Sequence, residues 1–139
     1  MMIDNRTPPV TPAVAAVVAS YPPAALAAFL ELRRMVFEAA LALDVGVLQE
    51  TLKWGEPAYL TTETKAGTTL RIAWKKSKPE QIGLYVNCQT SLVERFRHQF
   101  PDSFDFDGNR GLLMSCNKAI PEKTLGGVIA ATLTYHRNK

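Results

Sequence analysis

The chain has 139 residues, of which 47% are hydrophobic, 21% charged and 9% aromatic, and this balance excludes an intrinsically disordered protein. Its length suits one compact domain that buries a core without help from disulfides or metals. The 16 Lys and Arg exceed the 13 Asp and Glu by a formal net charge of +3, and the basic residues form no long run, so we expect no nucleic-acid partner.

Residues 1–11 are polar and contain proline, which predicts a flexible N-terminal leader before a single domain over residues 12–139. The leader lacks the basic and apolar regions of a secretory signal, and the apolar run at Pro12–Ala19 is too short to span a membrane. Cys88 and Cys116 are too far apart for a C-x-x-C motif, so we expect reduced thiols with small, buried side chains. Together these features predict a cytoplasmic protein with no membrane partner.

Two helices are expected next. Thr11, with Pro12 in the first turn, begins a short helix that runs to the break at Tyr21–Pro23. A longer helix begins near Pro23 and ends near residues 44–46, because its apolar residues recur every three or four positions and form one face. The residues of this face are Phe29, Leu32, Val36, Ala40 and Leu43.

The middle of the chain predicts four strands. Residues 51–54 and 58–62 are expected to form strands joined by a tight Gly-Glu-Pro link. Strict alternation predicts two further strands over Leu70–Lys75 and Ile82–Val86, paired as an antiparallel hairpin. One face of this hairpin carries an apolar set: Leu70, Ile72, Trp74, Ile82, Leu84 and Val86.

The last third of the chain returns to helical spacing over Thr90–Phe100. Alternation over residues 104–106, a turn at Asp107-Gly108 and a returning strand over Arg110–Cys116 predict a second hairpin. Pro121 then opens a final amphipathic helix. This order of elements predicts an α+β fold, with a mainly antiparallel sheet of about five or six strands and helices packed on one face.

Candidate metal and catalytic groups have simpler explanations. Glu94 and His98 share a helix face without a third ligand nearby, which fits a solvated ion pair better than a metal site. The stretch from Asp105 imitates the start of a calcium loop, but Arg110 and Cys116 stand where that loop needs glycine and glutamate. The sequence contains no nucleophile elbow and no Gly-rich phosphate loop. We therefore expect a protein that is not an enzyme and that holds no metal or cofactor.

The second face of the predicted sheet collects basic and aromatic side chains. If the apolar set packs against the helices, Arg71, Lys75, Tyr85 and Asn87 point away from them. Lys53 joins this face because it alternates with its leucine and tryptophan neighbours. Such a surface can hold an anionic ligand, a partner protein or a single nucleic-acid strand by charge and stacking. The alternative is an ordinary solvated sheet face, which needs polar residues in any case.

The most distinctive stretch is LKWGEPAYL at Leu52–Leu60. Its glycine and proline predict a sharp redirection of the chain around Glu56, with the rings of Trp54 and Tyr59 packing on either side of the bend. Whether this bend binds a ligand or only completes the structure stays open. The candidate ligand-binding residues are Lys53, Trp54, Glu56, Tyr59, Arg71 and Tyr85.

A W-G-x-P-x-Y sequence that follows E-T-[LI], here at Glu50–Tyr59, resembles the signature of the YdhG-like family, numbered 1801 among domains of unknown function. The likeness extends to IGLYV at Ile82–Val86 and to the proline-opened last helix, which ends in TYHRNK at Thr134–Lys139. The resemblance implies a frataxin-like fold. It also implies a possible activity, because at least one member of the family has been treated as a frataxin-like iron chaperone.

Iron handling of that kind needs clustered carboxylates on an exposed helix or strand edge. The first two predicted helices carry only Glu31, Glu38 and Asp44 as acids, these are spread apart, and the chain is net basic. We therefore expect a non-enzymatic binding module for a small anionic ligand or a protein partner. The alternative is a frataxin-like intracellular iron chaperone. The oligomeric state stays open.

Overall fold

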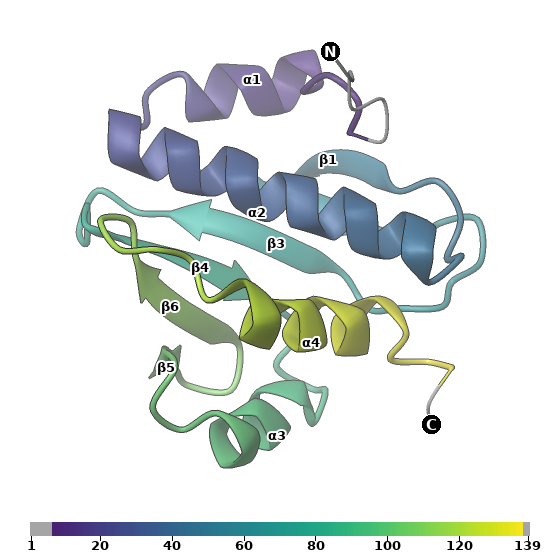
Figure 1. Ribbon diagram of the computed structural model, residues 1–139. Helices are drawn as coiled ribbons and strands as arrows, with labels where there is room; N and C mark the ends of the chain where they lie inside the picture. Colours follow the sequence, from purple (N-terminus) through teal and green to yellow (C-terminus); the bar gives the residue numbers. More distant parts are fainter. Residues whose placement is uncertain (1–6, 138–139) are drawn as a thin grey trace.

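Four helices and six strands follow one another within residues 7–137, the part of the chain that the computed structural model describes (Figure 1). The strands form one sheet in the order β1-β2-β3-β4-β6-β5, and every neighbouring pair is antiparallel. This architecture confirms the predicted α+β class. The elements are α1 (Pro12–Val18), α2 (Pro23–Ala42), β1 (Gln49–Lys53), β2 (Glu56–Leu60), β3 (Leu70–Trp74), β4 (Gln81–Tyr85), α3 (Leu92–Gln99), β5 (Asp105–Asp107), β6 (Gly111–Ser115) and α4 (Glu122–Leu133).

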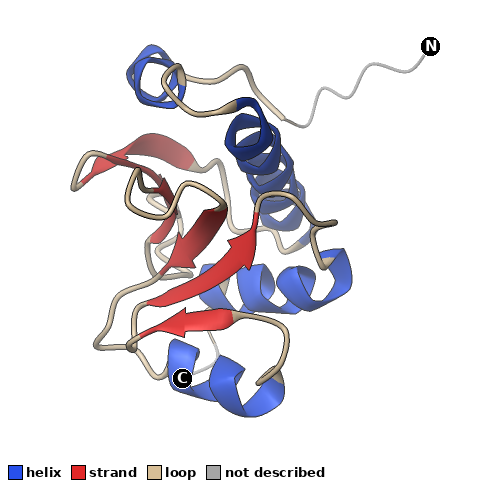
Figure 2. Cartoon of the chain, turned by 90° about the vertical axis from the view of Figure 1, so that its left-hand side faces the viewer, coloured by secondary structure: helices blue, strands red, loops and turns tan. Residues whose placement is uncertain are grey.

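The helices lie on one side of the sheet, and the described residues place no helix over its other face (Figure 2). The long helix α2 crosses β3 and β4, with α4 beside it, while α1 packs on β1 and β2. The shorter helix α3 contacts α4 near the edge of the sheet formed by β5. The sheet therefore has a covered face, which belongs to the core, and a bare face.

Helix α2 forms where the apolar periodicity predicts it. Phe29, Leu32 and Val36 are fully buried against the sheet, since they recur on the face that points inward. The helix begins directly after Pro22, and the residue beyond its C-cap, Asp44, takes a left-handed backbone with a φ of 54°. A left-handed residue at this point is a common way for a helix to end.

The apolar residues of the central strands build the rest of the core. Leu70 and Ile72 of β3 and Ile82 and Leu84 of β4 are all fully buried, which confirms the predicted orientation of this hairpin. Trp74 is only partly buried: its indole N–H donates to the carbonyl of Pro79 at 2.9 Å.

The β1–β2 hairpin differs from its prediction, because both strands begin two residues earlier than residues 51–54 and 58–62. The turn consists of Trp54 and Gly55 alone, with φ values of 56° and 74°. A two-residue loop with positive φ at both positions matches the right-handed twist of the strands and keeps them paired up to the turn. Glu56 and its proline neighbour therefore belong to β2 rather than to the bend.

The start of the described chain is tied to the domain. Arg33 donates to the carbonyls of Pro8 at 2.7 Å and Pro9 at 3.1 Å, and the N–H of Thr11 donates to Glu50 at 2.9 Å. We call Thr7–Thr11 the N-terminal strap. This part of the predicted leader is thus held against α2, whereas residues 1–6 lie outside the described residues.

The structure also tests two smaller expectations, on the second hairpin and on the cysteines. The predicted hairpin between β5 and β6 is confirmed, but Asp107 belongs to β5 and the turn consists of residues 108–110, where Gly108 has a φ of 54°. The expectation of two buried thiols is wrong: Cys88 is exposed because it lies in the loop after β4, and Cys116, directly after β6, is only partly buried. Among the described helices, none has the length and apolar character needed to cross a membrane.

Candidate functional site

The register of the sheet brings the predicted basic and aromatic residues together on the bare face. Arg71 lies opposite Ala58 of β2 on one side and opposite Tyr85 of β4 on the other. Residues directly opposite one another in antiparallel strands point to the same face. Arg71 and Tyr85 therefore both point away from the helices, as the alternation predicts.

The ring of Tyr85 is a fixed platform on this face. It lies over two glycines of the neighbouring backbone, since a Cβ added at Gly83 or Gly111 would come within 2.7 or 2.6 Å of the ring. Its hydroxyl donates to the Asp107 carboxylate at 3.0 Å. Burial, followed by this hydrogen bond, raises the pKa of Tyr85 to about 12. The phenol therefore stays protonated, with its ring packed on the two glycines and its hydroxyl held by Asp107.

Two cations share this ring. The Arg71 guanidinium lies 5.4 Å and the Lys75 ammonium 5.0 Å from the ring centroid of Tyr85. Together with the glycines, they leave Tyr85 only 3% exposed, although it lies on the face without helices. Arg71 also forms an ion pair with Glu56, whereas Lys75 pairs with no carboxylate of the described residues.

Lys53 and Trp54 extend the site at the end of β1. Lys53 is exposed and lies opposite Glu56 in the register. Trp54 is 91% exposed, which contradicts the expectation that its ring packs against the bend. Its left-handed backbone leaves the indole outside the hairpin, and that conformation costs a residue with a Cβ about 1–2 kcal/mol.

Tyr59 does not join the other predicted site residues. It lies three positions after Glu56 in the same strand, and an odd separation turns a side chain to the opposite face. Tyr59 is fully buried among the helices, where its ring meets Phe37 edge to face at 5.7 Å. Its hydroxyl donates to Glu50 at 2.7 Å. The assignment of Tyr59 to the ligand site is therefore corrected to a role in the core.

A buried ion pair lies beneath the N-terminal strap. Arg33 Nε donates to Glu50 Oε2 at 2.6 Å, and each of the two side chains is 3% exposed. Glu50 also accepts from Tyr59 and from the N–H of Thr11. Burial has the largest effect on the pKa of Glu50 and raises it, but these three donors and the charge of Arg33 outweigh burial and lower it.

Sequence reasoning missed this pair for a physical reason. Arg33 and Glu50 are 17 residues apart and belong to different elements, so nothing in the local pattern joins them. The available signal was an arginine directly beside the buried face of α2, next to Leu32 and one turn before Phe37. The Arg33 guanidinium in fact lies 4.7 Å from the centroid of the Phe37 ring.

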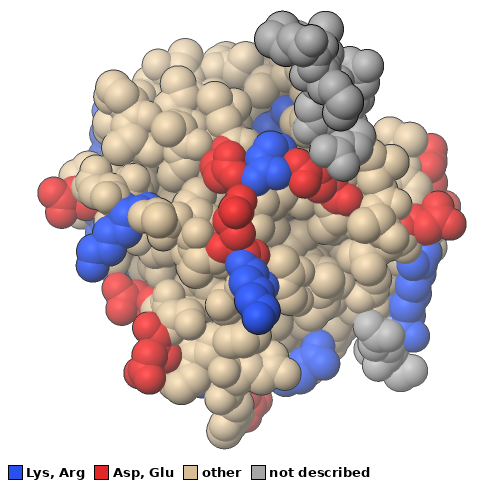
Figure 3. Space-filling view, viewed as in Figure 1, with Lys and Arg blue, Asp and Glu red and all other residues tan. Residues whose placement is uncertain are grey.

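A second charged cluster occupies the outer surface of the helices. Arg34 forms ion pairs with Glu31 and Glu38 of its own helix and with Glu122 of α4, the last at 2.8 Å. Figure 3 shows acidic and basic side chains side by side over the middle of α2 and toward α4. The hydrogen bond from Arg34 lowers the pKa of Glu31. Within residues 7–137, no three His, Cys, Asp or Glu side chains are arranged to hold a metal ion.

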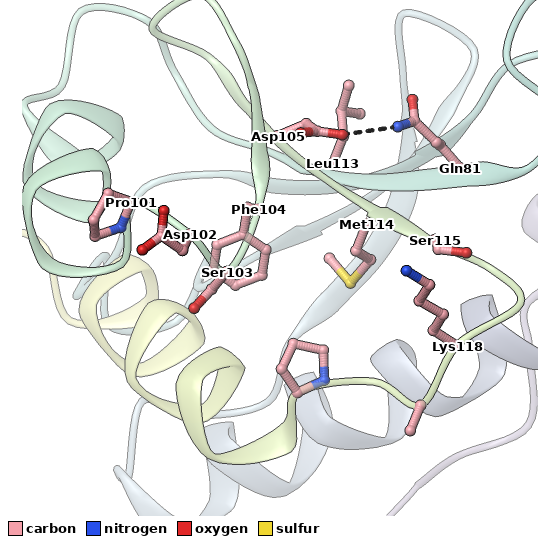
Figure 4. A pocket seen from close by; sticks show the side chains of 12 residues that line it. Gln81, Pro101, Asp102, Ser103, Phe104, Asp105, Leu113, Met114, Ser115 and Lys118 are labelled. Atoms are coloured by element: carbon pink, nitrogen blue, oxygen red, sulfur yellow. Dashed lines mark hydrogen bonds between the residues drawn. The ribbon is translucent and has the colours of Figure 1, made fainter.

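A hollow of about 560 Å³ lies at the opposite edge of the sheet, beside β5 and β6. In Figure 4 the Gln81 amide is directed at Asp105, to which it donates at 3.2 Å. The hollow is also lined by Asp102 and Lys118, which come from two separate loops. None of the predicted site residues lines this hollow, because its loops are distant in sequence and come together only in the folded chain.

Comparison with protein-family models, curated proteins and solved structures gives no match to this chain. The resemblance to the YdhG-like family, and the frataxin-like fold that it implies, therefore stay predictions that rest on the sequence motif.

Proposed function

We propose that the protein is a non-enzymatic binding module whose bare face holds an anionic group of a small ligand or of a protein partner. The observation that carries this proposal is the position of Arg71 and Lys75, whose charges lie 5.4 and 5.0 Å from the centroid of the Tyr85 ring. Like charges on one ring repel each other, and Glu56 offsets only one of them. A carboxylate or phosphate that binds both cations removes that repulsion.

The hydrogen-bonding capacity of the two cations supports the proposal. Arg71 donates one hydrogen bond to Glu56, and its other N–H groups donate to no described residue. A guanidinium presents its donors in a planar fork that fits a carboxylate or phosphate, while the Lys75 ammonium adds a point charge. Because Tyr85 holds both cations in place beforehand, binding a ligand orders few additional side chains.

The remaining predicted residues take different parts in this proposal. Lys53 supplies a third positive charge on the neighbouring hairpin, and Trp54 supplies an exposed apolar surface at its tip. Tyr85 acts beneath the cations rather than by stacking on the ligand, since its ring is covered. Glu56 orients Arg71 and competes with the ligand for it. We propose that the module acts in the cytoplasm, as the sequence predicts.

A titration followed by NMR tests the proposal. Isotope-labelled protein is titrated with inorganic phosphate, citrate or hexaglutamate, and at least one of these is expected to shift the amides of Arg71, Lys75 and Tyr85 in a saturable way. The double variant Arg71→Gln/Lys75→Gln is expected to raise Kd about tenfold, because it removes both direct donors. The matched control Lys76→Gln/Lys78→Gln removes the same charge from exposed lysines of the following turn and is expected to leave Kd nearly unchanged.

Two outcomes contradict the proposal. If none of the three anions produces saturable shifts on the bare face, the cations do not form a binding site. If both double variants weaken binding equally, the protein attracts anions through its net charge rather than through Arg71 and Lys75.

The alternative function, a frataxin-like iron chaperone, requires carboxylates that are free to bind iron. Glu31, Glu38 and Glu122 converge on the outer surface of the helices, but among the described residues no three acidic, His or Cys side chains are arranged to hold a metal ion. Arg34 occupies the centre of that cluster and pairs with all three carboxylates. Calorimetric titration of ferrous iron into the protein tests this alternative, and the absence of heat beyond dilution would reject it.

A further inference from the structure

A groove of about 590 Å³ lies where the end of α2 meets the loop before β1. Phe37 and Leu41 of α2 form one wall, and Val47 of the loop forms the facing part. Pro8 of the N-terminal strap closes one side, and Glu63 reaches the groove from the loop between β2 and β3. Three separate stretches of the chain thus build this groove: the strap, residues 37–48 and the loop between β2 and β3.

The groove carries exposed apolar side chains. Leu41 is 58% and Val47 is 72% exposed, although both are large and hydrophobic. Single exposed apolar residues are ordinary, but two that border the same groove, above the buried Phe37, mark a surface suited to binding. A ligand that covers them removes apolar area from water.

The rim of the groove is acidic. Among the residues that line it, Asp44 and Glu63 are charged, and none is Lys, Arg or His. Glu63 accepts one hydrogen bond from the N–H of Val47 at 2.9 Å, and the Asp44 carboxylate has no partner among the described residues. Arg137 approaches Asp44, but it donates to the main-chain oxygen at 2.8 Å. Two acidic side chains at the rim are thus combined with an apolar floor.

From these features we propose that the groove docks a short segment of a partner protein in which leucine-like side chains stand next to a lysine or arginine. The apolar side chains enter between Leu41 and Val47, and the cation pairs with Asp44 and Glu63. The groove is formed before binding, because Arg33 holds the strap through the Pro8 carbonyl at 2.7 Å.

This site is separate from the anion site on the bare face. The groove adjoins the beginning of β1, whereas Lys53 and Trp54 lie at its end, and the two sites prefer ligands of opposite charge. Loss of one site is therefore compatible with full function of the other.

Synthetic peptides supply the probe. Two acetylated peptides of leucine, lysine and alanine are titrated into isotope-labelled full-length protein, one with leucines at alternate positions and one with leucines at every fourth position. Counterparts with glutamate in place of lysine serve as controls. We expect at least one lysine peptide to shift the amides of Leu41, Gly46 and Val47 in a saturable way, and its glutamate counterpart to bind about tenfold more weakly.

Charge-removing variants then test whether peptide binding depends on the acidic rim. Asp44→Asn/Glu63→Gln keeps the local structure, because asparagine tolerates the φ of 54° at position 44 and glutamine still accepts from the N–H of Val47. This variant is expected to raise Kd for the lysine peptide about fivefold or more. The control Glu94→Gln/Asp102→Asn makes the same charge change at exposed positions outside the groove and is expected to leave Kd unchanged.

Three results would overturn the proposal. The first is that neither lysine peptide shifts the amides of the groove. The second is that lysine and glutamate peptides bind equally well. The third is that the protein alone dimerises in sedimentation and the same amides shift with its concentration. The third result assigns the groove to a second copy of the chain. Leu41→Ser/Val47→Ser provides an independent check, since it replaces exposed side chains and is expected to abolish peptide binding while leaving the circular dichroism spectrum unchanged.

Discussion

The ion pair between Arg33 and Glu50 makes a stringent prediction about stability. Replacing Arg33 with methionine keeps a long apolar side chain over Phe37 but removes the charge that Glu50 faces at 2.6 Å. It also leaves the carbonyls of Pro8 and Pro9 without their donor. The variant therefore removes the partner of a buried carboxylate and loosens the attachment of the N-terminal strap at the same time.

The expected loss is large compared with the stability of a small domain. Breaking a buried ion pair by removing one partner costs about 3–5 kcal/mol, because the remaining charge has no compensation. A domain of this size has a free energy of unfolding of about 5–15 kcal/mol. We expect Arg33→Met to lower the free energy of unfolding by about 3–5 kcal/mol at about pH 7. Arg33→Met/Glu50→Gln should lose less, about 1–2 kcal/mol, because a neutral glutamine still accepts from Tyr59 and Thr11.

The dependence on pH follows from the pKa of Glu50. This pKa is lowered in the folded protein, so the pair stabilises the fold above the ordinary value of about 4.3 and loses that contribution as the pH falls below it. In Arg33→Met, burial and the loss of the arginine raise the pKa of Glu50 instead. Because the carboxyl group can then protonate, the difference between wild type and variant should shrink between about pH 7 and about pH 4.

Urea denaturation followed by circular dichroism measures these differences. Arg34→Met is the matched control, since Arg34 is the next residue in the helix but its ion pairs are at the surface, where their loss should cost about 1 kcal/mol or less. If Arg33→Met costs no more than Arg34→Met, or if the Glu50→Gln change recovers nothing, the buried pair does not have the energetic role that its geometry indicates.

Two further predictions concern the bare face and the hairpin turn. Gly111→Ala places a Cβ 2.6 Å from the Tyr85 ring and should lower the free energy of unfolding by about 1–3 kcal/mol in urea denaturation, whereas Gly126→Ala, which has open space in α4, should raise it by up to about 1 kcal/mol. Equal effects would show that Tyr85 is not fixed by the glycine beneath it. Trp54→Asn should raise the melting temperature, because asparagine adopts a positive φ at lower cost, and an unchanged or lower value would show that the exposed indole stabilises the turn.

Hydrophobic periodicity predicted the parts of the fold in which burial alone decides the conformation. The inward residues of α2 and of the β3–β4 hairpin, such as Phe29 and Ile72, lie in the core as their spacing indicates. The displaced ends of β1 and β2 have a different cause. A two-residue turn with positive φ is usually predicted from an Asn-Gly or Asp-Gly dipeptide. Here tryptophan precedes Gly55, so the sequence lacks that signal.

Strand alternation predicted only those residues of the candidate site that lie in regular strands. Alternation correctly placed Arg71 and Tyr85 on the bare face, because both belong to regular strands. Tyr59 was assigned to the site from its place beside the predicted bend, whereas alternation along β2 turns it to the face opposite Glu56. The groove beside α2 was not predicted, because Pro8 and Glu63 are distant in sequence from residues 37–48, which form most of its lining.

The distinctive Glu50–Tyr59 stretch combines two physical roles that the sequence does not separate. Glu50 and Tyr59 face the helices, where their hydrogen bond belongs to the buried network of Arg33, and the fold explains both residues. Trp54 has the opposite character, because it combines a strained backbone with an almost fully exposed ring, and neither feature stabilises the fold. An exposed aromatic ring at the tip of a hairpin is suited to an external contact. The same substitution, Trp54→Asn, should therefore raise stability and weaken ligand binding on the bare face, and only a functional role for Trp54 accounts for both effects together.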